Sequence, residues 1–96
     1  MDIKDIKIKL KNSEQFLKDE FLVKRIGVFG SYSRGEQTRK SDVDILVEFI
    51  EEPSLFKFIR LERYLTNILG VKVDLVMKNA LKYYIGKHIL KEVNYL

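Results

Sequence analysis

The chain has 96 residues, of which 46% are hydrophobic and 33% charged, with a formal net charge of +4 and a pI of about 9.3. This length and composition are typical of one globular domain and exclude a disordered or low-complexity chain. Because the chain has no cysteine and one histidine, disulfides and thiolate metal sites are excluded, and a histidine-based zinc site is implausible.

The sequence shows no targeting or membrane signal. Residues 1–12 lack the apolar core of a signal peptide, and no apolar run approaches the ~20 residues of a membrane span. We therefore expect a soluble, cytoplasmic protein that does not bind membranes. A basic chain can bind nucleic acid, nucleotide phosphates or an acidic protein. The lysines are spread along the chain, which favours a solvated surface and disfavours nucleic acid as the partner.

The first half of the chain predicts one helical region and two strands. Residues 3–21 have a helical pattern with a break near Asn12 and Ser13, either of which would cap a second helical piece. Val23–Phe29 is a short run with β-branched residues, typical of a strand. Residues 30–41 form a polar loop with room for a helical turn, and residues 42–49 predict a second strand.

The second half predicts a helix, a strand and a C-terminal helix. Residues 51–54, Glu-Glu-Pro-Ser, are a helix start, so we expect a helix over residues 54–69 that ends at Gly70. Residues 71–77 predict the third strand, and from Asn79 onward the pattern is helical. The order α-β-β-α-β-α indicates an α/β (α+β) fold, in which a small mixed β-sheet has helices packed on one face.

The helix over residues 54–69 carries two apolar rows. The row assigned to the core comprises Leu55, Phe58, Ile59, Leu65 and Leu69. A second row comprises Leu61, Tyr64 and Ile68. This second row is either a surface that binds a partner or an extension of the core.

Three aspartates are the candidates for catalysis. Asp42 and Asp44 are two residues apart in a strand, so their side chains point to the same side. A carboxylate pair of this kind can bind the two metal ions of a two-metal site, and Mg²⁺ prefers such oxygen ligands. Asp74 lies on the polar side of the third strand and would be a general base or a further metal ligand.

Each of these residues also has a structural interpretation. Asp42 would cap a turn, Asp44 would pair with a lysine and Asp74 would face solvent. Glu48 lies on the same polar face as the first two aspartates but farther along the strand, and we interpret it as structural. His88 is interpreted as a partly buried structural residue, and Tyr83 and Tyr84 as packing or rim residues.

The loop between the first two strands has the composition of a phosphate-binding turn. Gly30 permits close approach of the backbone to a ligand, and Ser31 adds a hydroxyl and an N–H group. Arg34, Arg39 and Lys40 are candidates to neutralise a triphosphate. The loop has no G-x-x-x-x-G-K-[ST] pattern and no G-x-S-x-G pattern, which excludes a Walker A loop and a nucleophile elbow.

Residues 30–49, GSYSRGEQTRKSDVDILVEF, resemble the signature of the DNA polymerase β-like nucleotidyltransferase superfamily. They are most similar to the minimal nucleotidyltransferase (MNT) group, whose pattern is Gly-Ser, ten residues and Asp-x-Asp. The resemblance extends to VDLV around Asp74 and to ALKYYIGKHILKEVNYL at residues 80–96. It departs from the pattern at Ser33, where a small alanine is frequent.

The resemblance implies a polymerase β-like nucleotidyltransferase fold, with residues 1–96 as a single minimal nucleotidyltransferase domain. It implies that Asp42 and Asp44 bind Mg²⁺, with two ions expected and Mn²⁺ as an alternative, and that Asp74 completes the triad. Gly30 and Ser31 would hold the phosphates of ATP. Members of the MNT group are commonly paired with a HEPN-domain toxin encoded by the adjacent gene, and they act as antitoxins by transferring AMP from ATP to a tyrosine of that toxin.

Three functional hypotheses remain open from the sequence. The first is this protein adenylyltransferase, in a hetero-oligomer with its toxin, because 96 residues leave no room for a domain that binds a small acceptor. The second is an antitoxin that masks its partner sterically without catalysis. The third is a nucleotidyltransferase that acts on a small molecule or an RNA end.

Overall fold

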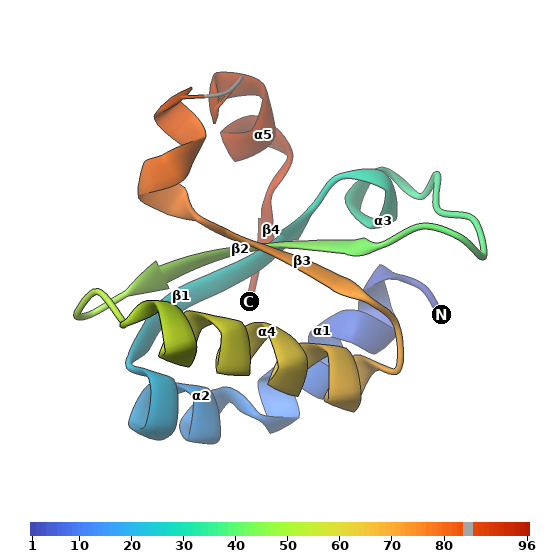
Figure 1. The fold of residues 1–96 in the computed structure, drawn as a ribbon. Helices are drawn as coiled ribbons and strands as arrows, with labels where there is room; N and C mark the ends of the chain where they lie inside the picture. The colour runs from blue at the N-terminus through green and yellow to red at the C-terminus, as the bar shows by residue number, and fades with distance from the viewer. Residues whose placement is uncertain (84–85) are drawn as a thin grey trace.

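A mixed sheet with strand order β3-β2-β1-β4 forms the centre of the molecule (Figure 1). The structure is a computed structural model, which describes the backbone of residues 1–83 and 86–96 and the side chains of residues 1–80 and 89–96. The elements are α1 (Ile3–Asn12), α2 (Glu14–Phe21), β1 (Val23–Phe29), α3 (Ser31–Arg34), β2 (Val43–Phe49), α4 (Leu55–Leu69), β3 (Val73–Met77), the 3₁₀-helix η1 (Lys78–Tyr83), α5 (Gly86–Glu92) and β4 (Asn94–Tyr95).

The two N-terminal helices are separated where the sequence predicts the break. Asp2 and Asp5 form a capping box at the start of α1, and Ser13 lies between α1 and α2. Ser13 does not cap α2 with its side chain; its Oγ accepts a hydrogen bond from the Tyr64 hydroxyl of α4 instead, at 3.1 Å. The hydroxyl therefore joins α4 to the junction between the helices.

The sheet combines antiparallel and parallel pairing. β1 pairs antiparallel with β2 and with β4, and β2 pairs parallel with β3 after the crossover through α4. The predicted mixed α/β sheet is confirmed. β4 was not predicted, because its two residues lie in a segment whose pattern is helical and a pattern contains no information about a distant pairing partner.

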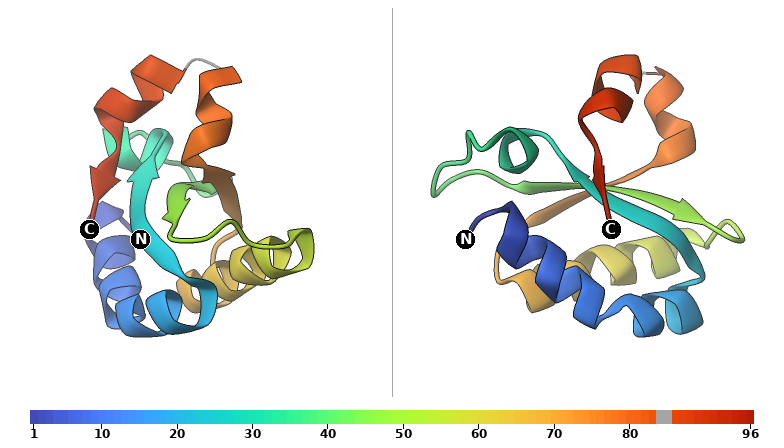
Figure 2. Two further views of the ribbon diagram at one scale, coloured as in Figure 1. Left: turned by 90° about the vertical axis from the view of Figure 1, so that its left-hand side faces the viewer. Right: turned by 180° about the vertical axis from the view of Figure 1, so that it is seen from behind.

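Different segments of the chain pack on the two faces of the sheet (Figures 1 and 2). Helices α1, α2 and α4 pack on one face, where Val43, Ile45 and Val47 of β2 are fully buried. The C-terminal segment lies on the other face, contrary to the expectation that all helices share one side. Its placement follows from a small apolar cluster on that face, formed by Phe29 and Leu46 with Val76, Ile89, Val93 and Tyr95.

The prediction for α4 is confirmed only in part. Leu65 and Leu69 of the predicted core row are fully buried. Leu61, assigned to the second row, is fully buried, and Tyr64 and Ile68 pack against the core. Leu55 and Ile59, assigned to the core, are 70% and 38% exposed. Of the two interpretations of Leu61, Tyr64 and Ile68, extension of the core is therefore confirmed and a partner-binding surface is wrong. The apolar residues left exposed lie in the first half of the helix.

The helix predicted from Asn79 onward is divided into η1 and α5. The interpretations of Tyr83, Tyr84 and His88 concern side chains outside the described residues. Within the described part of the chain, no helix has both the length and the apolar character needed to cross a membrane.

Candidate active site

The register of β2 and β3 places two of the three aspartates side by side. Asp44 and Asp74 are paired Cα positions in the parallel ladder, and neighbouring strands are about 4.8 Å apart. Asp42 directly precedes β2 and is two residues from Asp44, so its side chain lies on the same side. The aspartates occupy the sheet face opposite α1, α2 and α4, as the alternation predicts.

The electrostatics of Asp44 show that the carboxylates act on one another. Partial burial raises the pKa of Asp44 to about 6, with repulsion from Asp74 and then Asp42 as further causes. The positive charge of Arg34 lowers this pKa, and the negative charge of Glu92 raises it. Negative charge is therefore concentrated at this point of the sheet, and a bound cation would reduce the repulsion between the carboxylates.

Gly30 is the residue whose backbone packs directly against Asp44. A Cβ atom at position 30 would overlap with Oδ2 of Asp44, so a larger residue would displace that carboxylate. Gly30 also has φ 76° and ψ −153°, a conformation that is essentially restricted to glycine. The turn leads into α3, which begins at Ser31 and is anchored by the buried Tyr32 side chain. Gly30 and Ser31 thus border the carboxylates.

The donor chemistry of the site fits Mg²⁺. Asp42, Asp44 and Asp74 supply only carboxylate oxygens, the donors that Mg²⁺ prefers, and Mg²⁺ needs few protein ligands because it keeps waters and substrate phosphates. Among the described residues, no three acidic or histidine side chains are already close enough to hold one ion.

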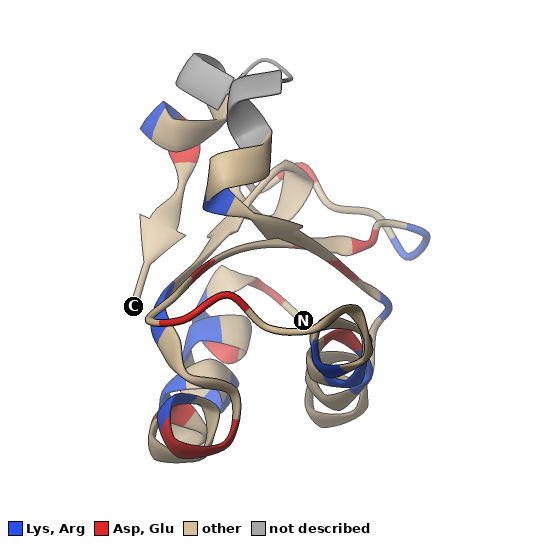
Figure 3. Ribbon diagram, turned by 60° about the vertical axis from the view of Figure 1, so that its left-hand side comes forward, with Lys and Arg blue, Asp and Glu red and all other residues tan. Residues whose placement is uncertain are grey.

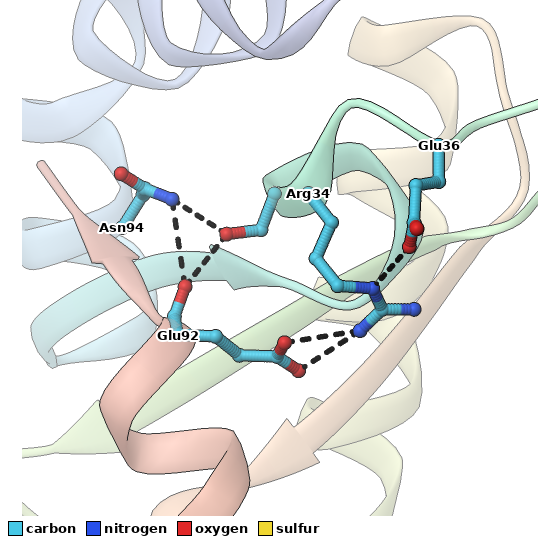
Figure 4. A network of polar contacts seen from close by, with 5 residues as sticks. Arg34, Glu36, Glu92 and Asn94 are labelled. Atoms are coloured by element: carbon cyan, nitrogen blue, oxygen red, sulfur yellow. Dashed lines mark hydrogen bonds and ion pairs between the residues drawn. The ribbon is translucent and has the colours of Figure 1, made fainter.

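The three basic residues of the loop have different environments. Arg34 donates from Nε to Glu36 at 2.6 Å and from Nη1 to both carboxylate oxygens of Glu92, at 3.0 and 3.3 Å (Figure 4). These carboxylates raise the pKa of Arg34. Arg39 and Lys40 lie in an exposed turn between α3 and β2. Of the three, Arg34 is the one whose charge acts on Asp44.

A second charged row crosses the same face farther along the strands. Glu48 lies between Arg25 and Lys78, with N–O distances of 3.8 and 3.4 Å, and Arg25 stacks on the ring of Tyr95 at 3.6 Å. These contacts agree with a structural role for Glu48, which also lines a pocket of about 370 Å³.

Charges of both signs are interspersed over the helices (Figure 3), as the scattered lysines of the sequence indicate.

Two residues at the C-terminal side of the site were given no role in the sequence analysis. Glu92 binds Arg34, and Asn94 donates from Nδ2 to Oγ of Ser33 at 2.5 Å. Ser33 itself was interpreted only as a conservative departure from the usual alanine. No local pattern reveals these contacts, because the partners are separated by 58 and 61 positions.

The sequence that builds this site matches a known protein family. Residues 10–96 match the model of the nucleotidyltransferase domain family. The chain belongs to this family. Two relatives are 52% identical over 96 residues: the protein adenylyltransferase MntA of Thermococcus cleftensis, with 100% of this chain and 97% of the relative covered, and a proposed protein adenylyltransferase of Methanocaldococcus jannaschii, with 99% and 95% covered.

Solved structures agree with this assignment. A proposed minimal nucleotidyltransferase is similar over 100% of this chain and 97% of that chain, with 32% identity and a TM-score of 0.83. A chain from a toxin–antitoxin complex with AMP-PNP is 32% identical over 72% of this chain and 57% of that chain, with a TM-score of 0.60. A chain from the complex of a tri-AMPylated HEPN toxin of Shewanella oneidensis with its MNT antitoxin is 26% identical over 75% and 55%, with a TM-score of 0.54. The predicted nucleotidyltransferase fold is confirmed.

Proposed function

We propose that this nucleotidyltransferase transfers AMP from ATP to a tyrosine hydroxyl of a HEPN-domain partner encoded by the adjacent gene, and thereby acts as an antitoxin. The observation that carries the proposal is the register that sets Asp44 beside Asp74 and behind the Gly30 turn. A carboxylate cluster next to a glycine turn provides a metal site and a phosphate site at one point of the sheet.

The similar proteins support the choice of donor and acceptor. Relatives that match almost the whole chain at 52% identity are named protein adenylyltransferases. One similar structure contains the ATP analogue AMP-PNP, and another contains a HEPN toxin that carries AMP groups. These proteins favour ATP as the donor and a protein of the HEPN class as the acceptor.

In this proposal each residue of the site has a separate task. Asp42 and Asp44 hold Mg²⁺, with Asp74 as the third carboxylate, and the ion when bound neutralises phosphate charge and favours in-line displacement. The backbone N–H groups at Gly30 and Ser31 hold phosphate oxygens. Arg34 donates to the triphosphate, and Arg39 and Lys40 in the neighbouring turn add positive charge.

The reaction forms one bond and breaks one. The acceptor oxygen attacks the α-phosphorus of ATP, and the bond between that phosphorus and the bridging oxygen to the β-phosphate breaks, so pyrophosphate leaves. Asp74 accepts the proton of the attacking hydroxyl, since it is the most exposed of the three carboxylates and lies beside Asp44. Exposure on this side of the sheet allows a macromolecular acceptor to reach it.

The intact mass of the HEPN partner tests the proposal. The partner is incubated with this chain, ATP and Mg²⁺, and we expect a gain of whole AMP units, with the modified tyrosine located by fragmentation. Asp42→Asn/Asp44→Asn should abolish the gain, and so should EDTA. Asp19→Asn, which removes an exposed carboxylate on α2 across the sheet, is the matched control and should leave the gain unchanged.

Three other outcomes would contradict parts of this proposal. A stable complex that inhibits the toxin without any gain in mass would replace catalysis with steric masking. Equal AMP transfer by the wild type and by Asp42→Asn/Asp44→Asn would refute the proposed roles of these carboxylates. Turnover of a small alcohol or an RNA end by the isolated chain would move the acceptor to another class.

A further inference from the structure

The end of the chain is docked tightly against the strand that leads to the site. β4 pairs with β1 through Gly27 and Val28, opposite Tyr95 and Asn94. A Cβ atom on Gly27 would lie 2.5 Å from the Val93 side chain and 3.0 Å from the Asn94 carbonyl oxygen. Because only a glycine leaves room for this approach, the segment between α5 and β4 has a defined position over β1.

A partly buried polar cluster fixes this segment to α3 (Figure 4). The Ser33 hydroxyl donates to the Glu92 carbonyl oxygen at 2.6 Å and accepts from Nδ2 of Asn94. Asn94 Nδ2 also lies 3.5 Å from the same carbonyl. The main chain of Glu92 is therefore held by a side chain of α3, the short helix that follows Gly30.

The Glu92 side chain then holds the guanidinium of Arg34. Glu92 accepts two hydrogen bonds from Nη1, and Glu36 accepts one from Nε. Among the described residues, Nη2 makes no hydrogen bond. A planar guanidinium held at two of its nitrogens has a defined direction for the third, and the two free N–H groups on Nη2 suit phosphate oxygens.

We propose that Glu92 is a positioning residue for the nucleotide: it orients Arg34 so that Nη2 meets the triphosphate. This inference rests on the proposed nucleotidyltransferase function. It assigns a role to the C-terminal segment, which lies outside the Gly-Ser and Asp-x-Asp motifs.

Loss of Glu92 should change the nucleotide affinity in the direction opposite to the one that electrostatics alone would cause. Glu92 is negative and borders the carboxylates, so loss of its charge alone would favour binding of an anionic nucleotide. Loss of orientation would weaken binding, because a long arginine side chain must then be ordered when the nucleotide binds. Ordering one such side chain corresponds to about 3- to 10-fold in affinity. The sign of the change in affinity therefore separates the two effects.

Direct measurement of nucleotide affinity tests the proposal. Calorimetric titration of the full chain with AMP-PNP and Mg²⁺ should show about 3- to 10-fold weaker binding for Glu92→Ala. Glu92→Gln, which keeps the shape and one acceptor oxygen, should lose less affinity. Circular dichroism of both variants checks that a loss of affinity does not come from misfolding. Glu20→Gln, an exposed glutamate of α2, is the charge-matched control and should bind like the wild type.

A double-mutant comparison separates positioning from general support of the fold. In an Arg34→Ala background, Glu92→Ala should cause no further loss of affinity, because Glu92 acts through Arg34. In AMP transfer, Glu92→Ala should raise KM for ATP and leave kcat nearly unchanged. An equal loss in both backgrounds, or binding by Glu92→Ala as tight as the wild type, would overturn the positioning role.

The failure of this inference can be told apart from the failure of the proposed function. If the wild-type chain binds no AMP-PNP in the presence of Mg²⁺, both are wrong. If the wild type binds the nucleotide and transfers AMP while the Glu92 variants behave identically, only the positioning role is wrong.

Discussion

Replacement of Asp44 by asparagine should stabilise the metal-free protein while it removes the proposed activity. Burial of about half of the side chain, and then repulsion from Asp74 and Asp42, raise the pKa of Asp44 from 3.8 to about 6. A carboxyl group that binds its proton more tightly in the folded state destabilises the fold once it is ionised. An asparagine side chain has a similar shape and no charge, so the Asp44→Asn variant avoids that cost.

The size of the effect follows from the pKa. The difference between 3.8 and about 6 corresponds to about 3 kcal/mol, at about 1.4 kcal/mol per pH unit. Because the side chain is only half removed from solvent, screening reduces this to about 1–2 kcal/mol. For a chain of this length, that is a rise in Tm of roughly 5–10 °C.

The pH dependence of stability gives the sign of the contribution that Asp44 makes to the free energy of unfolding. Below pH 3.8 the group is protonated in both the folded and unfolded states and costs nothing. Between pH 3.8 and about 6 the unfolded state ionises first, so the free energy of unfolding of the wild type falls as the pH rises. Above about pH 6 the whole cost is present.

Thermal unfolding in EDTA at pH 7.5 and at pH 3.5 measures this. At pH 7.5 we expect Asp44→Asn to melt above the wild type, and at pH 3.5 the two should coincide. Mg²⁺ should raise the Tm of the wild type at pH 7.5 more than that of the variant, since the ion binds the folded state. Asp19→Asn is the control. A lower Tm for Asp44→Asn at pH 7.5, or a difference independent of pH, would refute the electrostatic reasoning.

Three further substitutions, two of them with a matched control variant, test the packing that builds the site. Gly30→Ala places a non-glycine residue in a restricted backbone conformation and brings its Cβ atom into overlap with the Asp44 carboxylate, so urea unfolding should show a free energy of unfolding lower by at least about 1–3 kcal/mol. The control is Gly35→Ala, at φ 71° with open space around it, which should lower the free energy of unfolding by only about 1 kcal/mol. Leu61→Ala should cost about 2–5 kcal/mol by denaturation, whereas Leu55→Ala should stay within about 0.5 kcal/mol, and equal losses would contradict the orientation of α4. Gly27→Val should displace β4 and raise KM for ATP in the transfer assay, and an unchanged KM would show that this docking does not affect the nucleotide.

Local patterns of the sequence predicted the elements that shape the site. A short run with β-branched residues predicted β1 with its observed bounds. Alternation predicted β2 and β3 to within two residues, because side chains in a strand alternate between faces with a fixed period. The same period placed Asp42 and Asp44 on one side. Gly30 was predicted to let the backbone approach a ligand, which stays a prediction. What the structure shows at Gly30 is close packing against the Asp44 carboxylate.

The helices were predicted less completely. The 3.6-residue period identified both apolar rows of α4 but not which residues of each row are buried. That choice depends on what the sheet and α1 present to the helix, and it buried Leu61 while it left Leu55 exposed. A sequence pattern describes one helix at a time, whereas burial depends on the surfaces that meet.

Strands β1, β2 and β3, the spacing of the aspartate pair and the glycine turn could all be predicted from local sequence, because each depends on neighbours within a few residues. The tertiary structure decided the contacts that join distant segments. The pairing of Asp44 with Asp74 depends on the parallel register set by the α4 crossover, and that of Arg34 with Glu92 depends on β4 returning to the edge of β1. Chain folding brings such partners together without any local signal, since the free energy of their contact arises only after the intervening chain is packed.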